Sequence, residues 1–499
     1  MSEISQTKKL GVLSLVMMIF SIIFGFTNPT IAFLKLGYSS IMWYVFSAIT
    51  FFLPMVFIVA EFAVSFKNDA SGGIYTWMSR SRGELYGFVG TFMWYFVIVV
   101  WITGICARIW VPISSLLFAE DKTKTWNLFG LGSTKTLAIF GILLIIGTTF
   151  MATKGFNKVS LIAKIGGLSC TAINILLYIT STLILILNKG YFEEPIKGVE
   201  TFFKSPNPND TMITLFAFIT FSVFAFGGIE ALASLVDKAK SAKTFSKACI
   251  IGGIVIAVGY STAIFFWGIT ANYKEMNTQA HLGNVLFIFM RNLGYKLGLA
   301  LGMPIEAASN LGSIFMRIVG VSIFFSFLGA LFTIVYSPIK TLFDGSPKGL
   351  WSENFTKKNS ANMPQNAMWI QAIIVCLILG VTPFLGDAMA TFFEILQLLT
   401  NVAQSLAFIF IIAAFPAFRK NENLDHDFKI FKTNGLAYFV TTVALLVLSF
   451  ATIFTIFEPV LTKAPGGLSK TMIMIIGPVV FFVIALLIFK SYEKKKDNI

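Results

Sequence analysis

The sequence predicts an all-α polytopic membrane protein with twelve transmembrane helices. Hydrophobic residues make up 56% of the 499 residues, and charged residues only 12%, about half the share of roughly 25% that is usual in soluble domains. Apolar runs of about 20 residues, the length that crosses a hydrocarbon layer about 30 Å thick, recur along the whole chain. This composition excludes an ordinary soluble enzyme, a disordered chain and a disulfide-stabilised scaffold.

Twelve apolar runs predict one span each, and together they leave no room for a domain outside the membrane. The runs begin near Leu10, Ile41, Leu85, Thr136, Ser160, Thr211, Cys249, Gly312, Ala367, Thr391, Gly435 and Thr471. The run Leu85–Phe118 is longer than an upright helix needs, so we expect it to be tilted or to extend above the bilayer. Between Leu282 and Phe289, apolar residues at helical spacing predict a short helix on the outer surface.

The distribution of basic residues predicts that both termini are cytoplasmic. An even number of spans places both termini on one side of the membrane. With cytoplasmic termini, 24 of the 38 Lys and Arg residues fall in inside segments and 12 in outside loops, while Arg108 and Arg317 lie within spans. This bias follows the positive-inside rule. The net charge of +14 is therefore read as a property of a membrane protein, without a nucleic-acid partner.

Two spans are predicted to be interrupted in the middle of the membrane. The first contains Phe24–Pro29 and the sixth contains Phe224–Glu230, which includes Gly227 and Gly228. Pro29 lacks an N–H group and clashes with the preceding turn, and the paired glycines favour helix weakly. The interruptions are five spans apart, so the second set of five helices is inverted relative to the first. Matched interruptions of this kind indicate a transporter site; the alternative is that the glycines only allow close helix packing.

Interrupted helices offer a particular binding chemistry. The N-terminus of a half-helix presents free N–H groups and a positive dipole end to a carboxylate. The C-terminus of a half-helix presents carbonyl groups to an ammonium. One interrupted helix of each polarity therefore fits both ends of a zwitterion without a charged side chain, and an α-amino acid is the natural ligand.

Several motifs resemble those of a known transporter superfamily. Ala60–Phe62 and Ser71–Trp77 resemble the end of helix two and the following loop of amino acid–polyamine–organocation (APC) transporters. Phe224–Glu230 resembles the helix-six signature of the same superfamily. Ser337–Lys340, together with Met363–Pro364, resembles the exit of helix eight in its glutamate:γ-aminobutyrate antiporter branch.

The resemblance implies a fold and a site. The fold is of the LeuT type, with a first inverted repeat at residues 1–188, a second at 211–416, and two peripheral helices at 435–490. The substrate carboxylate is then expected at the first interruption and the amine at the second. The substrate-binding residues that the resemblance implies are Gly25, Phe26, Thr27, Asn28, Phe226, Gly227 and Gly228.

Three ionisable residues within spans are candidates for proton coupling or gating, because such groups at membrane depth are costly. Glu230 follows the glycine pair and is a candidate proton carrier, or it braces the broken helix by accepting backbone N–H groups. Glu61 lies near the cytoplasmic surface and is either a second candidate or a local partner of the inside loop. Arg108 lines the outer vestibule and attracts an anionic substrate, or it extends to water.

The sequence thus indicates a secondary active transporter of amino acids across the cytoplasmic (inner) membrane, working by alternating access. Glutamate/γ-aminobutyrate-type antiport is the leading form, and a proton-coupled amino-acid or amine symporter is the alternative. A channel is the alternative from another class. An enzyme is not expected, because no span carries a His pair or an Asp pair. A nucleotide-driven pump is excluded, because no nucleotide-binding P-loop motif occurs.

No metal or cofactor is predicted. The four cysteines, at positions 106, 170, 249 and 376, lie in apolar runs without metal-ligand spacing, and His281 and His426 are far apart in the sequence. The expected partners are the amino-acid substrate, the lipid bilayer and protons. The chain is expected to be a monomer or a homodimer.

Overall fold

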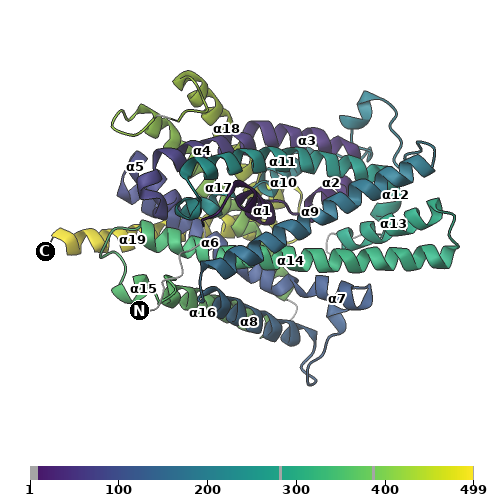
Figure 1. Ribbon diagram of the computed structural model, residues 1–499, viewed down its shortest axis with the longest axis horizontal. Coiled ribbons are helices and arrows are strands. Elements are labelled where there is room, and N and C mark those ends of the chain that lie inside the picture. Colours follow the sequence, from purple (N-terminus) through teal and green to yellow (C-terminus); the bar gives the residue numbers. More distant parts are fainter. Residues whose placement is uncertain (1–8, 280–283, 385–387, 427, 498–499) are drawn as a thin grey trace.

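The computed structural model describes residues 9–279, 284–384, 388–426 and 428–497, with all side chains except those of residues 70–71, 388–395, 397 and 497. This part of the chain is a bundle of helices without a β-strand (Figure 1). Its one extended pairing is a backbone bridge between Leu10 and Ala239. His281 and Leu282, which the sequence analysis singled out, lie outside the described residues.

Fifteen helical elements precede the second interruption. They are α1 (Val12–Ile23), α2 (Thr27–Leu36), η1 (Gly37–Ser39), α3 (Ser40–Ser47), the π-helical turn η2 (Ala48–Phe52), α4 (Leu53–Ser65), η3 (Lys67–Gly72), α5 (Ile74–Arg82), α6 (Glu84–Arg108), α7 (Trp110–Phe118), η4 (Thr123–Thr125), α8 (Ser133–Ala152), α9 (Phe156–Leu187), η5 (Val199–Phe202) and α10 (Met212–Ala225).

The remaining elements follow that interruption. They are η6 (Ile229–Lys238), α11 (Ala242–Thr270), α12 (Tyr273–Gln279), α13 (Val285–Ala300), α14 (Ile305–Gly345), α15 (Glu353–Thr356), α16 (Gln365–Val381), η7 (Thr382–Phe384), α17 (Ala388–Lys420), α18 (Asn434–Leu461) and α19 (Gly467–Asp497).

The prediction of a polytopic membrane protein is confirmed. In the described ranges, eleven helical stretches are long and apolar enough to cross a membrane, and Val12–Ile23 is a shorter apolar helix. Together, the eleven stretches and the short helix account for the twelve predicted runs. Val12–Ile23 is the first half of the first run, and its second half continues into the second run through the turn Gly37–Ser39, which gives the single stretch Thr27–Ser65. The long third run forms one stretch, Glu84–Phe118, which bends at Ile109 between α6 and α7.

Both predicted interruptions are present. The first apolar run divides into α1 and α2, with Phe24–Phe26 between them, and the sixth divides into α10 and the 3₁₀ helix η6. A helix also forms where the sequence predicts one, as α13, with Val285, Leu286 and Phe289 buried. Its position on the outer surface stays a prediction.

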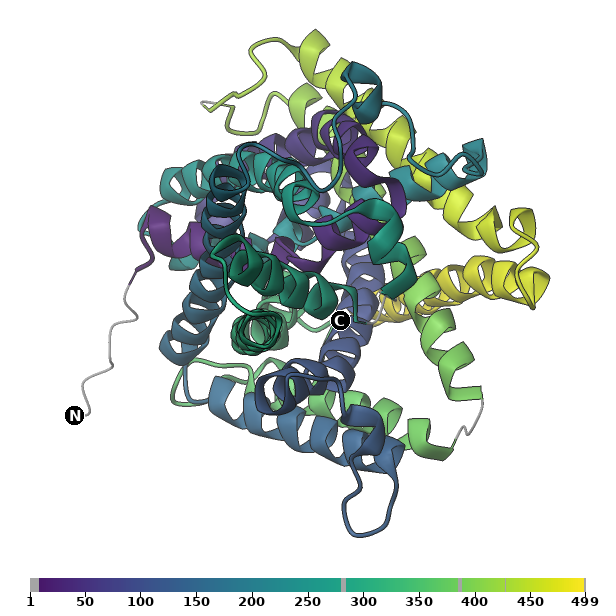
Figure 2. The same ribbon diagram turned by 90° about the vertical axis from the view of Figure 1, so that its right-hand side faces the viewer.

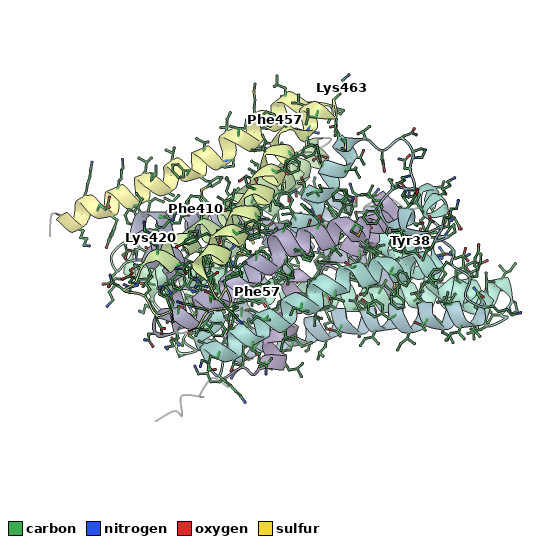
Figure 3. All side chains as sticks on the ribbon, turned by 90° about the horizontal axis from the view of Figure 1, so that it is seen from above. Tyr38, Phe57, Phe410, Lys420, Phe457 and Lys463 are labelled. Carbon is green, nitrogen blue, oxygen red and sulfur yellow. The ribbon has the colours of Figure 1, made fainter. Side chains whose placement is uncertain are left out.

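The two interrupted helices lie in the middle of the bundle. Figure 1 shows α1 and α10 surrounded by α9, α11, α14 and α17. The last two helices are peripheral: α18 and α19 lie at the edge of the bundle in Figure 2, and α19 runs along its outside in Figure 3. Exposed apolar side chains such as Leu487 and Val479 on α19 fit contact with lipid.

Candidate functional site

The first interruption is a short non-helical segment held by backbone hydrogen bonds. α1 ends when the Phe24 N–H bonds to the Phe20 carbonyl at 3.0 Å, and the Gly25 N–H then turns back to the Ile23 carbonyl at 2.9 Å. The Asn28 N–H bonds to the Gly25 carbonyl at 2.8 Å, which starts α2. A glycine fits here because a Cβ on Gly25 would lie 2.9 Å from Nδ2 of Asn28.

The second interruption depends on its two glycines. α10 ends with the Gly227 N–H bonded to the Phe224 carbonyl at 3.1 Å. Gly228 has a φ of +130°, a conformation that residues with a Cβ rarely adopt. A Cβ on Gly227 would lie 2.0 Å from Nε2 of Gln404 on α17. The sixth span therefore breaks here because both local conformation and tertiary packing require glycine.

Tyr260 of α11 joins the two interruptions. Its hydroxyl accepts the Gly25 N–H at 3.1 Å and Nδ2–H of Asn28 at 3.3 Å. The same hydroxyl lies 2.8 Å from the Ile23 carbonyl and 2.9 Å from the Ala225 carbonyl, either of which accepts its proton. Sequence analysis missed this residue. A tyrosine within an apolar span was the only local signal, and its partners are remote in the sequence.

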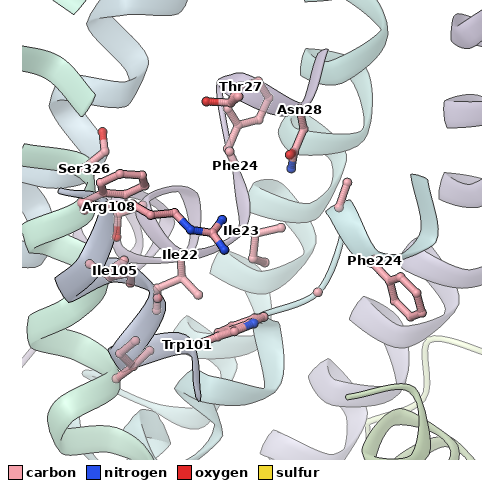
Figure 4. Close-up of a pocket in the computed structure, with 18 of the residues that line it drawn as sticks. Ile22, Ile23, Phe24, Thr27, Asn28, Trp101, Ile105, Arg108, Phe224 and Ser326 are labelled. Atoms are coloured by element: carbon pink, nitrogen blue, oxygen red, sulfur yellow. The ribbon is translucent and has the colours of Figure 1, made fainter. Parts of the chain in front are cut away.

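A cavity of about 350 Å³ lies between the two interruptions (Figure 4). It is bordered by α1, α2, α6, α9, α10, α14 and α17. Five of the seven predicted substrate-binding residues line it, namely Gly25, Phe26, Thr27, Asn28 and Gly227. The structure thus brings residues from two distant segments to one cavity of a size suited to a small molecule.

The other two predicted substrate-binding residues lie behind this lining. The Phe226 side chain is buried, stacks on Phe52 with ring centroids 4.5 Å apart, and contacts Tyr44 and Tyr260 edge-on or tilted. Gly228 packs against Ile22. Both residues support the shape of the second interruption, and a direct contact with substrate stays a prediction.

Glu230 is buried just behind the second interruption. One carboxylate oxygen accepts the Gly228 N–H at 3.1 Å, and the other accepts the indole N–H of Trp94 on α6 at 3.3 Å. This geometry is the one that bracing of the broken helix requires. Glu230 does not line the cavity, and its role in proton coupling stays a prediction.

Glu61 belongs to a separate, fully buried cluster. Its carboxylate forms an ion pair with Arg419 of α17 at 2.9 Å and accepts the backbone N–H groups of Ile430 and Phe431 at 2.6 and 2.9 Å. Arg419 also donates to the Phe431 carbonyl at 2.7 Å. Glu61 therefore fastens the connection between α17 and α18 through partners remote in the sequence, where a local partner was expected, and it does not line the cavity.

Arg108 lies in the cavity wall. It is the last residue of α6, its side chain is exposed to the cavity, and in Figure 4 its guanidinium points toward Ile23. The other intramembrane arginine, Arg317, donates to the carbonyls of Leu116 and Leu117 at 3.0 and 2.9 Å. Arg108 makes no comparable hydrogen bond or ion pair with any residue in the described ranges.

The far end of η6 is closed by polar contacts with α14. Nζ of Lys340, which is almost fully buried, donates to the Ser234 carbonyl at 2.9 Å and pairs with Asp237 at 3.2 Å. Ser234 donates to the Ser337 carbonyl at 2.9 Å. These contacts fasten the second half of the broken helix and close the bundle on that side.

Comparison with known proteins identifies the family. The sequence model of the amino acid permease family matches residues 10–484. The chain is 39% identical to the inner membrane transporter YjeM of Salmonella typhimurium, over 98% of this chain and 97% of that protein. It is also 39% identical to YjeM of Escherichia coli, over 97% and 96% of the two chains. A glutamate/gamma-aminobutyrate antiporter of Lactococcus lactis is 22% identical over 94% of this chain and 87% of its own. The chain is therefore a multi-pass membrane protein that belongs to the amino acid permease family, within the APC superfamily.

Proposed function

We propose that this protein is a secondary active transporter that exchanges amino acids across the cytoplasmic membrane by alternating access. The observation that carries the proposal is one cavity lined by both interrupted helices, at Gly25–Asn28 and at Gly227. A half-helix end from each side suits the carboxylate and the ammonium of an amino acid. The family is a permease family, which supports transport over catalysis.

The architecture we propose is the two-repeat arrangement of the LeuT type. Residues 1–188 and 211–416 form two inverted repeats, each beginning with an interrupted helix, and residues 435–490 add the peripheral pair. The support is the position of the interruptions, in the first and sixth of twelve runs. The bias of Lys and Arg supports cytoplasmic termini.

Antiport of the glutamate/γ-aminobutyrate type is the finer form of the proposal. Its support is the name and the nearly full-length coverage of the Lactococcus lactis relative. Proton-coupled symport is the second candidate, and the buried carboxyl group of Glu230 beside the cavity favours it.

The test uses the purified protein in proteoliposomes. Vesicles preloaded with one unlabelled amino acid take up a labelled amino acid from outside, across a panel that includes acidic, neutral and basic members. Exchange predicts uptake that depends on the preloaded substrate. Uptake driven by a pH gradient into empty vesicles would assign symport instead, and no uptake of any amino acid under either condition would refute the proposal.

A further inference from the structure

The charge of the cavity wall narrows the substrate class. Arg108 is the single charged side chain among the cavity-lining residues that the structure describes, and no carboxylate occurs among them. The polar residues beside it, including Thr27, Asn28, Ser326 and Asn401, are neutral. The described side chains of the wall therefore carry a net positive charge, which attracts anions and repels cations in a site partly shielded from water.

The position of Arg108 argues for a ligand. The residue lies inside the candidate span Glu84–Phe118, where a charge is costly and is normally paired. Arg317, in the span Ile305–Gly345, follows that rule by donating to two backbone carbonyls. In the described part of the chain, Arg108 has no such acceptor, and its guanidinium extends into the cavity (Figure 4).

We propose that Arg108 binds a carboxylate on the substrate side chain, so that the transported amino acid is acidic. The proposal rests on the proposed function and adds a second anchor to it. The interrupted helices hold the amino-acid group, and the planar guanidinium, which suits bidentate binding of a carboxylate, holds the distal acidic group. Basic amino acids and polyamines are excluded because the described wall offers their extra ammonium no carboxylate.

The same anchor accounts for two substrates of different charge. Glutamate and γ-aminobutyrate share a carboxylate at the end of a three-carbon chain that carries the amine. Glutamate has a second carboxylate beside that amine, and γ-aminobutyrate lacks it. Arg108 binds the carboxylate that both possess, and one cavity then accepts either partner of an exchange.

The test compares acidic amino acids with their neutral isosteres. Labelled exchange is measured with glutamate against glutamine, and with aspartate against asparagine, as competitors. The parent protein is expected to favour the acid by at least about tenfold, since hydrogen bonds to charged groups are the stronger ones. Arg108→Gln should remove this preference, and Arg108→Lys should keep part of it because the charge remains. The control is Arg291→Gln, on the exposed surface of α13, which should keep the parental preference.

The outcomes separate this inference from the proposed function. Exchange of neutral amino acids with no preference for acids, unchanged in Arg108→Gln, would overturn the role of Arg108 and leave the transporter in place. Transport of basic amino acids in preference to acids would overturn it as well. Absence of exchange with every amino acid would refute the proposed function itself.

Discussion

At the scale of single residues, Tyr260 connects the two interruptions. Its hydroxyl has one proton, and the carbonyls of Ile23 and Ala225 are both within hydrogen-bond distance of it. Only one of them accepts the proton at a time, while the Gly25 N–H donates to the same oxygen. Rearrangement of either broken helix therefore changes the hydrogen bonding of the other.

Tyr260→Phe is expected to reduce transport by tenfold or more with the protein still inserted. The ring keeps its stacking on Phe24, and the Gly25 N–H keeps its bond to the Ile23 carbonyl. The Ala225 carbonyl loses its donor, at a cost of about 1–3 kcal/mol. Exchange in proteoliposomes and thermal unfolding in detergent measure the two effects. Tyr178→Phe is the matched control, because the described hydrogen bonds of the Tyr178 hydroxyl go to Thr262 and the Gly259 carbonyl and to neither interruption. Parental exchange in Tyr260→Phe would contradict the connecting role.

Glu230→Gln is expected to flatten the pH dependence of transport across about pH 5 to 8, the range in which a desolvated carboxyl group titrates. The variant keeps the size of the side chain and cannot exchange a proton. Trp94→Phe is the control: it removes the indole N–H bond to Glu230 but leaves the carboxyl group, so it should preserve the shape of the profile. If Glu230→Gln instead lowers activity at every pH and leaves the shape of the pH profile unchanged, then Glu230 only braces the broken helix and carries no proton.

At the scale of elements, the half-helices are set by close packing at their ends. Gly227 of the second interruption faces Gln404 and Phe408 of α17, with no space for a Cβ. Nε2 of Gln404 is buried without a hydrogen-bond partner in the described part of the chain. Close packing against α17 thus determines the position of the end of α10, and with it the position of the cavity wall at Gly227.

Gly227→Leu is expected to abolish transport while the protein still inserts, because insertion depends on the hydropathy of whole spans. The branched side chain must displace Gln404 and the lining beside it. Gly147→Leu is the control, since Gly147 of α8 is exposed with nothing near its Cβ position. Membrane content by immunoblot and exchange in proteoliposomes are compared. Unchanged transport kinetics in Gly227→Leu would place the substrate elsewhere.

The connection between α9 and α10 is fastened to α12 outside the spans. Glu194 accepts the Tyr273 N–H at 2.7 Å, and burial raises the pKa of its carboxyl group. Because the pKa is higher in the folded state than in the unfolded state, ionisation of this carboxyl group lowers the stability of the fold. This loss of stability is absent at pH values below the unfolded pKa and complete at pH values above the folded pKa. Glu194→Gln is therefore expected to raise the melting temperature at pH 7 and to leave it unchanged near pH 3. A lower melting temperature at pH 7 would show that the ionised form is needed.

At the scale of the whole molecule, polar contacts join α14 to η6 beyond the second interruption. The contacts of Lys340 with Ser234 and Asp237 join α14 to the second half of the broken helix. In the alternating access that we propose, this side opens, and these polar contacts then separate. Such contacts switch between discrete arrangements, which suits a two-state transporter.

Lys340→Gln is expected to shift the population toward the state open at the η6 end. The variant loses the ion pair with Asp237, whose side chain is 30% exposed, so the cost is smaller than the roughly 3–5 kcal/mol of a fully buried pair. The readout is modification of a Thr27→Cys reporter in the cavity by a membrane-impermeant thiol reagent added from each side. Labelling from the η6 side should increase several-fold. Lys348→Gln, in the exposed connection after α14, is the control. Equal labelling in all variants would exclude Lys340 as part of the closure.

The sequence by itself determined the membrane architecture and the positions of both interruptions. Hydropathy is summed within each apolar run, so spans are readable without knowledge of their neighbours. The interruptions at Phe24–Phe26 and Gly227–Gly228 were also predictable, because glycine and proline act on the local backbone. The substrate-binding residues came from the resemblance to APC transporters, and five of those seven residues line the cavity.

The tertiary structure alone decided how these segments meet. Tyr260 contacts Ile23 across 237 residues of sequence, and Arg419 pairs with Glu61 across 358. No local pattern marks such partners, because each depends on the distance between side chains of helices that pack together. Packing between helices also explains why the Phe226 side chain lies behind the cavity lining, since its ring stacks on Phe52 of the second span. Local chemistry fixes where a helix crosses or breaks, and packing between helices fixes which side chains face the cavity.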